Sequence, residues 1–83
     1  MKINVKYFAS IREALGRGGE IVETSATTCA SLRDELLARG EPYAMALARG
    51  KSVRVALDQV MSDESAPLRD GCELAFFPPV TGG

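Results

Sequence analysis

The residues in this sequence whose type and position could do chemistry are the last two, Gly82 and Gly83. Glycine has no Cβ, so two terminal glycines can enter a channel little wider than a backbone and leave the final carbonyl open to attack. A carboxylate is a poor electrophile, and this chain offers nothing to activate it. We therefore expect a nucleotide-dependent partner to form an acyl-adenylate at Gly83, so that the chemistry is shared between two proteins.

The residues before the glycines predict a tail that leaves the fold. Pro78 and Pro79 have a fixed φ and no N–H, so a strand that ends at Phe77 cannot continue its hydrogen-bond ladder past them. Consecutive prolines favour a stiff, extended conformation, which would hold Val80 and Thr81 away from the body. At roughly 3.3–3.6 Å per residue, this tail reaches about 20 Å.

We therefore divide the chain into a domain over residues 1–77 and an extended, flexible tail over residues 78–83. The alternative is that the two glycines are a frayed terminus without a role, because chain ends are commonly small and disordered.

Composition excludes several classes of function. The chain has 83 residues and a net charge of −1, so we expect one domain that binds neither nucleic acid nor an anionic membrane. No apolar stretch is long enough to span a bilayer and the N-terminus does not resemble a signal peptide, so we expect a cytoplasmic protein. Cys29 and Cys72 lack metal-ligand spacing, and the absence of histidine argues against a zinc site and a self-contained hydrolase.

Hydrophobic spacing predicts the elements that must position the tail. Alternating residues predict strands over residues 2–8, 20–24, 53–57 and 72–77, with a short return strand at Val60 and Met61. Asp58 and Gln59 are expected to form the turn before that return strand. Two antiparallel strands therefore open the domain, and a single strand closes it.

Helical spacing predicts one main helix between the second and third strands. It begins at a cap on Thr27 or Thr28 and runs to Arg39, with Cys29, Leu32 and Leu36 facing the core. Glu35 and Arg39 are expected to pair on its solvent side. Shorter helical segments are expected over residues 9–15, capped by Ser10 with Glu13, and after Pro42.

The last strand predicts an exposed aromatic residue. If Leu74 and Phe76 fill the core, Phe77 points to the other face of the sheet. If the first and last strands are neighbours, Phe8 and Phe77 share this outer face, and with Met61 they form an apolar patch at the base of the tail. Such a patch usually marks a protein interface. The alternative is that each is an isolated surface hydrophobe or is covered by a loop.

Four stretches carry a resemblance to a known family over essentially the whole chain. They are VKYFA at residues 5–9 with Arg12 and Glu13, LDQ at 57–59, PLRDG at 67–71, and AFFPPVTGG at 75–83. The sequence resembles the sulfur-carrier small subunits of molybdopterin synthase, in the ubiquitin-like β-grasp superfamily. The resemblance implies an α+β fold in which a mixed sheet of four to five strands packs on one main helix, with an extended C-terminal tail.

The same resemblance implies a function. In this family an E1-like adenylating enzyme uses ATP to adenylate the terminal glycine, a sulfur donor converts it to a thiocarboxylate, and the tail inserts into the large synthase subunit. Sulfur then passes to cyclic pyranopterin monophosphate during molybdenum cofactor biosynthesis, in a heterotetramer of two small and two large subunits. The small subunit is not catalytic alone and holds no cofactor stably.

Individual residues carry over by position. Gly83 matches the sulfur-bearing residue and Gly82 its slender neighbour, while Phe8, Met61 and Phe77 match apolar contact positions. Arg12 is assigned to the same partner interface. Two alternatives stay open: a thiamine-type sulfur carrier or ubiquitin-like protein modifier, and a non-covalent interaction module.

Two positions depart from the family pattern. Asp58 stands where asparagine is more usual; both residues tolerate left-handed turn geometry, although a polar contact there could change. We expect Cys29 and Cys72 to be small buried hydrophobes rather than a disulfide or a catalytic thiol. Cys72 stands where an acidic residue is usual and could instead be an exposed thiol, to which we assign no role.

Overall fold

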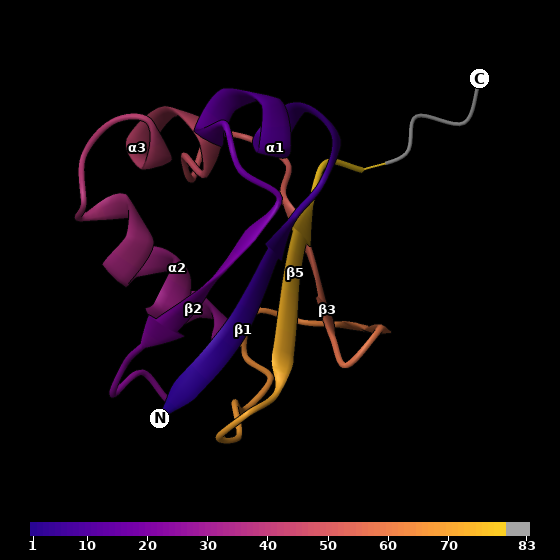
Figure 1. Ribbon diagram of the computed structural model, residues 1–83. Helices are drawn as coiled ribbons and strands as arrows, with labels where there is room; N and C mark the ends of the chain where they lie inside the picture. The colour runs from indigo at the N-terminus through magenta and orange to yellow at the C-terminus, as the bar shows by residue number, and fades with distance from the viewer. Residues whose placement is uncertain (80–83) are drawn as a thin grey trace.

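The computed structural model describes residues 1–79 and folds them into a five-stranded sheet with its helices gathered on one side (Figure 1). Along the chain the elements are β1 (Lys2–Tyr7), α1 (Ala9–Leu15), β2 (Gly19–Glu23), α2 (Cys29–Leu37), α3 (Tyr43–Ala46), β3 (Arg54–Leu57), β4 (Val60–Ser62) and β5 (Glu73–Phe77). The predictions for Val80, Thr81, Gly82 and Gly83 lie outside the described residues, and the division of the chain at residue 77 stays a prediction.

The sheet is mixed, as predicted. Its strands lie in the order β2-β1-β5-β3-β4, and β1 pairs parallel with β5 while the other neighbours are antiparallel. The first and last strands are therefore neighbours and run toward the same end, where Tyr7 lies beside Phe76. This pairing brings residue 8 and the base of the tail together.

The core lies between the sheet and α2. Alternate residues of β1 and β5 are fully buried, and the apolar stripe of α2 packs against them. The fully buried side chains from these three elements are Ile3, Val5, Tyr7, Cys29, Leu32, Leu36, Leu74 and Phe76. The spacing of apolar residues in the sequence therefore identified the inward face of each element correctly.

The two longer helices begin differently. Thr28 caps α2 and forms a capping box with Ser31, which confirms one of the two predicted caps. The predicted box of Ser10 and Glu13 is wrong. Phe8 is the N-cap of α1 and makes no side-chain cap hydrogen bond, so Ser10 already lies inside the helix, where it cannot cap.

The main helix is shorter than predicted. It ends at Leu37, so Arg39 leaves the helical surface and the predicted pair with Glu35 does not form. Arg39 donates instead to Glu20 on β2, at 3.1 Å, and Glu35 accepts from the Thr24 hydroxyl. Both partners lie on or just after the second strand, so tertiary neighbours replaced a contact that helical spacing alone suggested.

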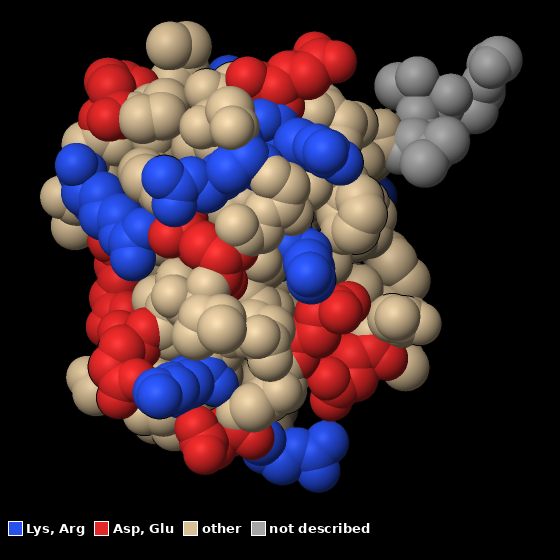
Figure 2. Space-filling model, viewed as in Figure 1, with Lys and Arg blue, Asp and Glu red and all other residues tan. Residues whose placement is uncertain are grey.

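The surface carries both signs of charge. Figure 2 shows lysine and arginine interspersed with aspartate and glutamate over the face in view. Within residues 1–79, no helix has the length and apolar character needed to cross a bilayer.

Candidate functional site

The tail begins at the same end of the sheet as the start of α1. β5 ends at Phe77, as predicted, and Pro78 and Pro79 follow it away from the strand (Figure 1). Proline cannot donate to the ladder, so the pairing of β5 with its neighbours stops here. This point fixes which side chains surround the base of the tail.

The register of the strands assembles the outer face of the sheet. One row crosses four strands, from Lys6 on β1 through Ala75 on β5 and Ala56 on β3 to Met61 on β4. In the next row toward the tail, Phe77 lies opposite Arg54. We define the outer patch as Phe8, Ala56, Met61, Ala75 and Phe77.

The outer patch is exposed at its two ends and buried in the middle. Phe8 is 47% exposed and Met61 is 61% exposed, although both are large apolar residues. Phe77 lies on the outer face as predicted, but it is half-buried because it sits on a central strand with neighbours on both sides. Ala56 and Ala75, which lie between the larger side chains, are only 8% and 5% exposed.

A tight turn places Met61 on this face. Asp58 and Gln59 both have positive φ, 48° and 69°, in a two-residue connection between the paired residues Leu57 and Val60. The Asp58 carboxylate also accepts a hydrogen bond from the Glu73 N–H at 3.0 Å, which ties the turn to β5. A register slip of one residue would move Met61 to the opposite face, so this turn determines the patch. The predicted left-handed geometry at Asp58 is confirmed.

Phe8 is held where β1 becomes α1. Its N–H donates to the Phe76 carbonyl at 3.2 Å, which extends the β1–β5 ladder by one residue. Its own carbonyl accepts from Ile11 and Arg12 as the first turn of α1 forms. Tyr7 points into the core, so the extended backbone at Phe8 directs its ring outward.

The fourth predicted interface residue lies apart from these three. Arg12 is on α1, with its guanidinium close to Gly18 in the connection to β2. It is exposed and pairs with no acidic side chain within residues 1–79. The structure thus brings Phe8, Met61 and Phe77 onto one face and places Arg12 beyond it, one helical turn after Phe8.

A polar cluster supports the patch from the core side. Glu20 on β2 accepts hydrogen bonds from the hydroxyls of Tyr7, at 2.8 Å, and Tyr43, at 2.6 Å, and from the guanidinium of Arg39. The Tyr7 ring stacks on Phe76 with centroids 6.3 Å apart. The cluster therefore joins β2, the segment after α2, and α3 to β1, which ends just before Phe8, and to β5, which carries Phe77.

The pKa values of this cluster follow from its contacts. Burial by itself would raise the pKa of Glu20, but hydrogen bonds from Tyr43, Tyr7 and Arg39 outweigh it and hold the pKa below its usual value. Burial, together with the hydrogen bond to Glu20, raises the pKa of Tyr7 far above its usual range. At neutral pH the carboxylate is charged and the phenol is neutral, so each keeps the form that its partner needs.

Both cysteines are free and buried, which confirms the prediction that they are small core residues. Burial is the main cause that raises the pKa of Cys29 to about 11, so its thiol is protonated at neutral pH and a poor nucleophile. The suggestion of an exposed thiol at Cys72 is wrong, because this residue is only 8% exposed and belongs to the core cluster. The described residues hold no group of three or more potential metal ligands.

Sequence reasoning missed the middle of the patch. Ala56 and Ala75 become part of a site only because β3 and β5 are paired in this register, and Arg54 joins its edge for the same reason. An alanine carries no signal of its own in a sequence, so nothing short of the strand pairing could have found these positions.

Comparison with known proteins identifies the family. A family model described as the ThiS family matches residues 5–83. The molybdopterin synthase sulfur carrier subunit of Escherichia coli is 41% identical over 81 residues, covering 98% of this chain and 99% of that protein. The subunit of the same name from Haemophilus influenzae is 38% identical with the same coverage.

A solved structure confirms the fold. One chain of the complex of subunits 1 and 2 of molybdopterin-converting factor from Helicobacter pylori is 25% identical, with a TM-score of 0.69 and 100% of both chains covered. The predicted α+β, ubiquitin-like β-grasp fold is confirmed. The residues that match the family model include the end of β1, all of β2 to β5, the outer patch and the residues after Phe77. The chain belongs to the ThiS family.

Proposed function

We propose that the chain is the sulfur carrier subunit of a molybdopterin synthase, with Gly83 as the residue that carries sulfur. The observation that carries this proposal is the near full-length similarity to two subunits of that name, at 38% and 41% identity. The geometry supports it, since an apolar patch adjoins the strand end from which Pro78 leads toward Gly83.

Loading of Gly83 takes two steps on other proteins. A carboxylate oxygen attacks the α-phosphorus of ATP on an E1-like adenylating enzyme, which forms an acyl-adenylate and releases pyrophosphate. Sulfur that the donor delivers as hydrosulfide then attacks the activated carbonyl and displaces AMP, which leaves a thiocarboxylate. In this proposal ATP is used by the activating enzyme, and this chain binds no cofactor stably. We place the loading reaction in the cytoplasm because ATP is available there.

Transfer takes place in the large subunit. The loaded tail enters that subunit, and the sulfur passes to cyclic pyranopterin monophosphate. Both thiols are buried and the sequence has no histidine, so this chain supplies neither an accessible thiolate nor a histidine base. Its part in the proposal is to hold and deliver the terminal sulfur.

The outer patch is the docking surface for the large subunit in this proposal. Phe8 and Met61 present exposed apolar surface, and Ala56 and Ala75 lie on the same face of the sheet. The related Helicobacter pylori chain was solved in a complex of two different subunits. We propose the same pairing here, in a heterotetramer of two small and two large subunits.

The mass of the intact chain tests the loading step. After incubation with ATP, a sulfur donor and the adenylating enzyme, we expect the replacement of one oxygen by sulfur at Gly83. The matched control is a chain that lacks only Gly83, which should stay unmodified. An unchanged mass for the full chain, or equal sulfur transfer by the shortened chain, would contradict the proposal.

The molecule that receives the sulfur distinguishes the proposed function from the two alternative carrier functions. A thiamine-type sulfur carrier or a ubiquitin-like modifier would load in the same way but deliver elsewhere. We expect dithiolene formation when the loaded chain is mixed with the large subunit and cyclic pyranopterin monophosphate. Loading without that transfer would favour one of the two alternatives.

A further inference from the structure

The strand β2 forms one edge of the sheet, and within residues 1–79 it pairs only with β1 (Figure 1). Ile21, in the middle of β2, is 68% exposed although it is a large apolar residue. An open strand edge with exposed apolar surface is a template for pairing with another chain.

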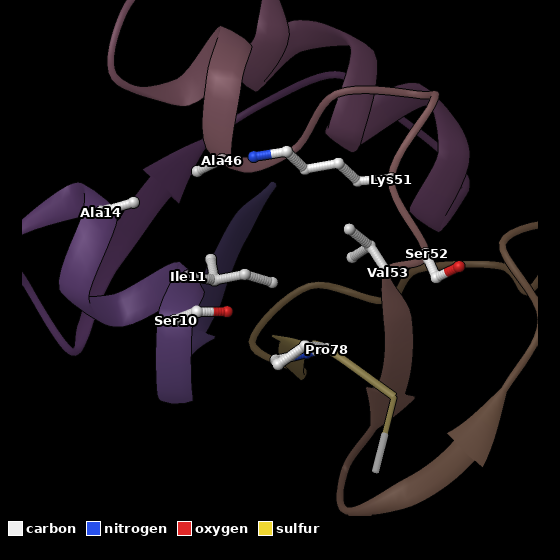
Figure 3. Close-up of a pocket in the computed structure, with 8 residues that line it drawn as sticks. All are labelled: Ser10, Ile11, Ala14, Ala46, Lys51, Ser52, Val53 and Pro78. Carbon is white, nitrogen blue, oxygen red and sulfur yellow. The ribbon is translucent and has the colours of Figure 1, made fainter. Parts of the chain in front are cut away.

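The helix layer closes a different part of the molecule. Figure 3 shows a hollow of about 100 Å³ beside the base of the tail, with walls that come from α1, α3, the segment before β3, and Pro78. No residue of β2 lines this hollow. The open edge of β2 is therefore a separate feature of the surface.

The β1–β2 ladder determines which backbone groups of β2 face the open edge. Thr24 and Met1 exchange two hydrogen bonds of 2.8 Å, and farther along the strands the Tyr7 N–H donates to the Gly18 carbonyl at 3.0 Å. Antiparallel strands alternate between bonded and non-bonded pairs, so the even-numbered residues from 18 to 24 face β1. The N–H and C=O groups of the odd-numbered residues face away from β1, and these residues are Gly19, Ile21 and Glu23.

A lysine side chain crosses this edge at Gly19. Lys6 lies opposite Gly19 in the ladder, and a Cβ at Gly19 would come 3.2 Å from the Lys6 Cδ and 2.7 Å from the Val5 carbonyl oxygen. Only the absence of a side chain at Gly19 leaves room for the Lys6 stem there. Neither Lys6 nor Glu23 forms an ion pair within residues 1–79.

We propose that β2 pairs antiparallel with β2 of a second copy of this chain, with the twofold axis at Ile21. In this register Ile21 lies opposite Ile21 of the other copy, and Gly19 lies opposite Glu23. All three are the residues whose backbone groups face outward, so each gains a hydrogen-bonding partner. The two sheets become one continuous sheet, and the exposed Ile21 side chains lie side by side at its centre.

The charges favour a second copy in this register. Glu23 lies opposite Lys2 in its own sheet, and the pairing places it beside the Lys6 side chain that crosses Gly19 of the other copy. The twofold axis forms this contact twice, so one chain supplies both halves of the complementary surface. Pairing centred on Glu23 would place two carboxylates opposite each other, which is unfavourable.

Sedimentation equilibrium of the full-length chain tests the pairing. One short strand buries little surface, so we expect a weak dimer with a Kd on the order of 100 µM. Lys6→Glu and Glu23→Lys each bring like charges together at both contacts and should each raise the Kd at least about tenfold. The double variant restores opposite charges and should return the Kd to within about threefold of that of the unaltered chain.

Matched controls carry the same charge changes elsewhere. Glu13→Lys and Lys51→Glu alter exposed residues outside the sheet and should leave the Kd unchanged. Added salt should reduce the difference between the single variants and the unaltered chain, because exposed charges are screened.

Ile21→Pro tests the backbone part of the pairing. Proline removes an N–H that faces the open edge, and an edge strand tolerates proline at such a position, so the β1–β2 ladder should persist. We expect this variant to stay monomeric. Circular dichroism melting curves establish which variants fold, and the charge exchange decides the question if Ile21→Pro does not.

Three outcomes would overturn the inference. The first is an unaltered chain that stays monomeric at about 1 mM. The second is a dimer that the single charge variants do not weaken, or that the folded double variant does not restore, because the copies would then meet through another surface. The third is an edge that pairs with a strand of another protein instead, shown by variants that weaken that binding while the chain alone is monomeric. The inference does not use Gly83, so sulfur loading of a monomeric chain would leave the proposed function standing.

Discussion

Met61 offers a sharp test of the outer patch because its neighbour along the chain is a matched control. Met61 and Val60 are adjacent on β4, and their exposed fractions are similar, 61% and 65%. They point to opposite faces, since Met61 pairs with Ala56 in the outer row and Val60 pairs with Leu57. If the outer face is a docking surface, truncation of Met61 should weaken binding and truncation of Val60 should not, although both residues are apolar and similarly exposed.

The expected size of the effect follows from the exposed fraction. Burying a whole methionine side chain stabilises by about 1.5–3 kcal/mol. With 61% still exposed, burial at an interface is worth about 1–2 kcal/mol. Met61→Ala should therefore raise the Kd for the large subunit roughly 5- to 30-fold. Met61→Asp should weaken binding further, because a charge would lose its water at the interface.

Isothermal titration calorimetry with the purified large subunit measures these changes. Val60→Ala should leave the Kd within about twofold of the unaltered chain, since Val60 lies on the other side of the hairpin. Thermal unfolding of each variant supplies the second control, because β4 is an edge strand and both truncations should cost little stability. Equal losses from Met61→Ala and Val60→Ala, or no loss from Met61→Ala, would refute the assignment of the outer patch.

Three further predictions concern the elements that hold the site. Asp58→Ala should destabilise the fold by about 1–3 kcal/mol in urea unfolding, because it removes the hydrogen bond to Glu73 and strains a residue with φ of 48°, whereas Asp58→Asn should cost much less. The Glu20 carboxylate has a lowered pKa, so its contribution to stability is present near neutral pH and is lost as the pH falls through its unfolded and then its folded pKa. Glu20→Gln should therefore reduce the fall in melting temperature between neutral and acidic pH. An unaltered fall in melting temperature would argue against the cluster. Cys29, with its pKa raised to about 11, should resist iodoacetamide at pH 8 until the chain unfolds, and rapid labelling of the native chain, followed by peptide mass mapping, would contradict its burial.

Much of the fold was accessible from local patterns. Alternation in residues 2–8 and 72–77 identified the two strands at the centre of the site and the residues of each that face the core. Asp58 and Gln59 were predicted to form a turn, and the structure confirms it, because both residues have positive φ in a two-residue connection. The prolines predicted where β5 ends, since they cannot donate to a ladder.

Contacts between distant elements were not accessible in this way. Helical spacing paired Arg39 with Glu35, but the side chain turned to Glu20 once β2 lay beside the end of α2. Ser10 looked like a cap, but the ladder from β1 runs on to Phe8 and starts α1 earlier. In both cases a tertiary partner offered a better contact than the local one.

The sequence by itself determined what the site is made of: a terminal glycine pair behind two prolines, and aromatic residues whose parity turns them away from the core. Those are local properties, fixed by the absence of a Cβ, the missing proline N–H and the two-residue repeat of a strand. Only the tertiary structure decided that Phe8, Phe77 and Met61 form one surface, because that depends on which strands pair and in which register. Register is set by pairing across the sheet and by the turn at Asp58, so it exists only once the chain has folded.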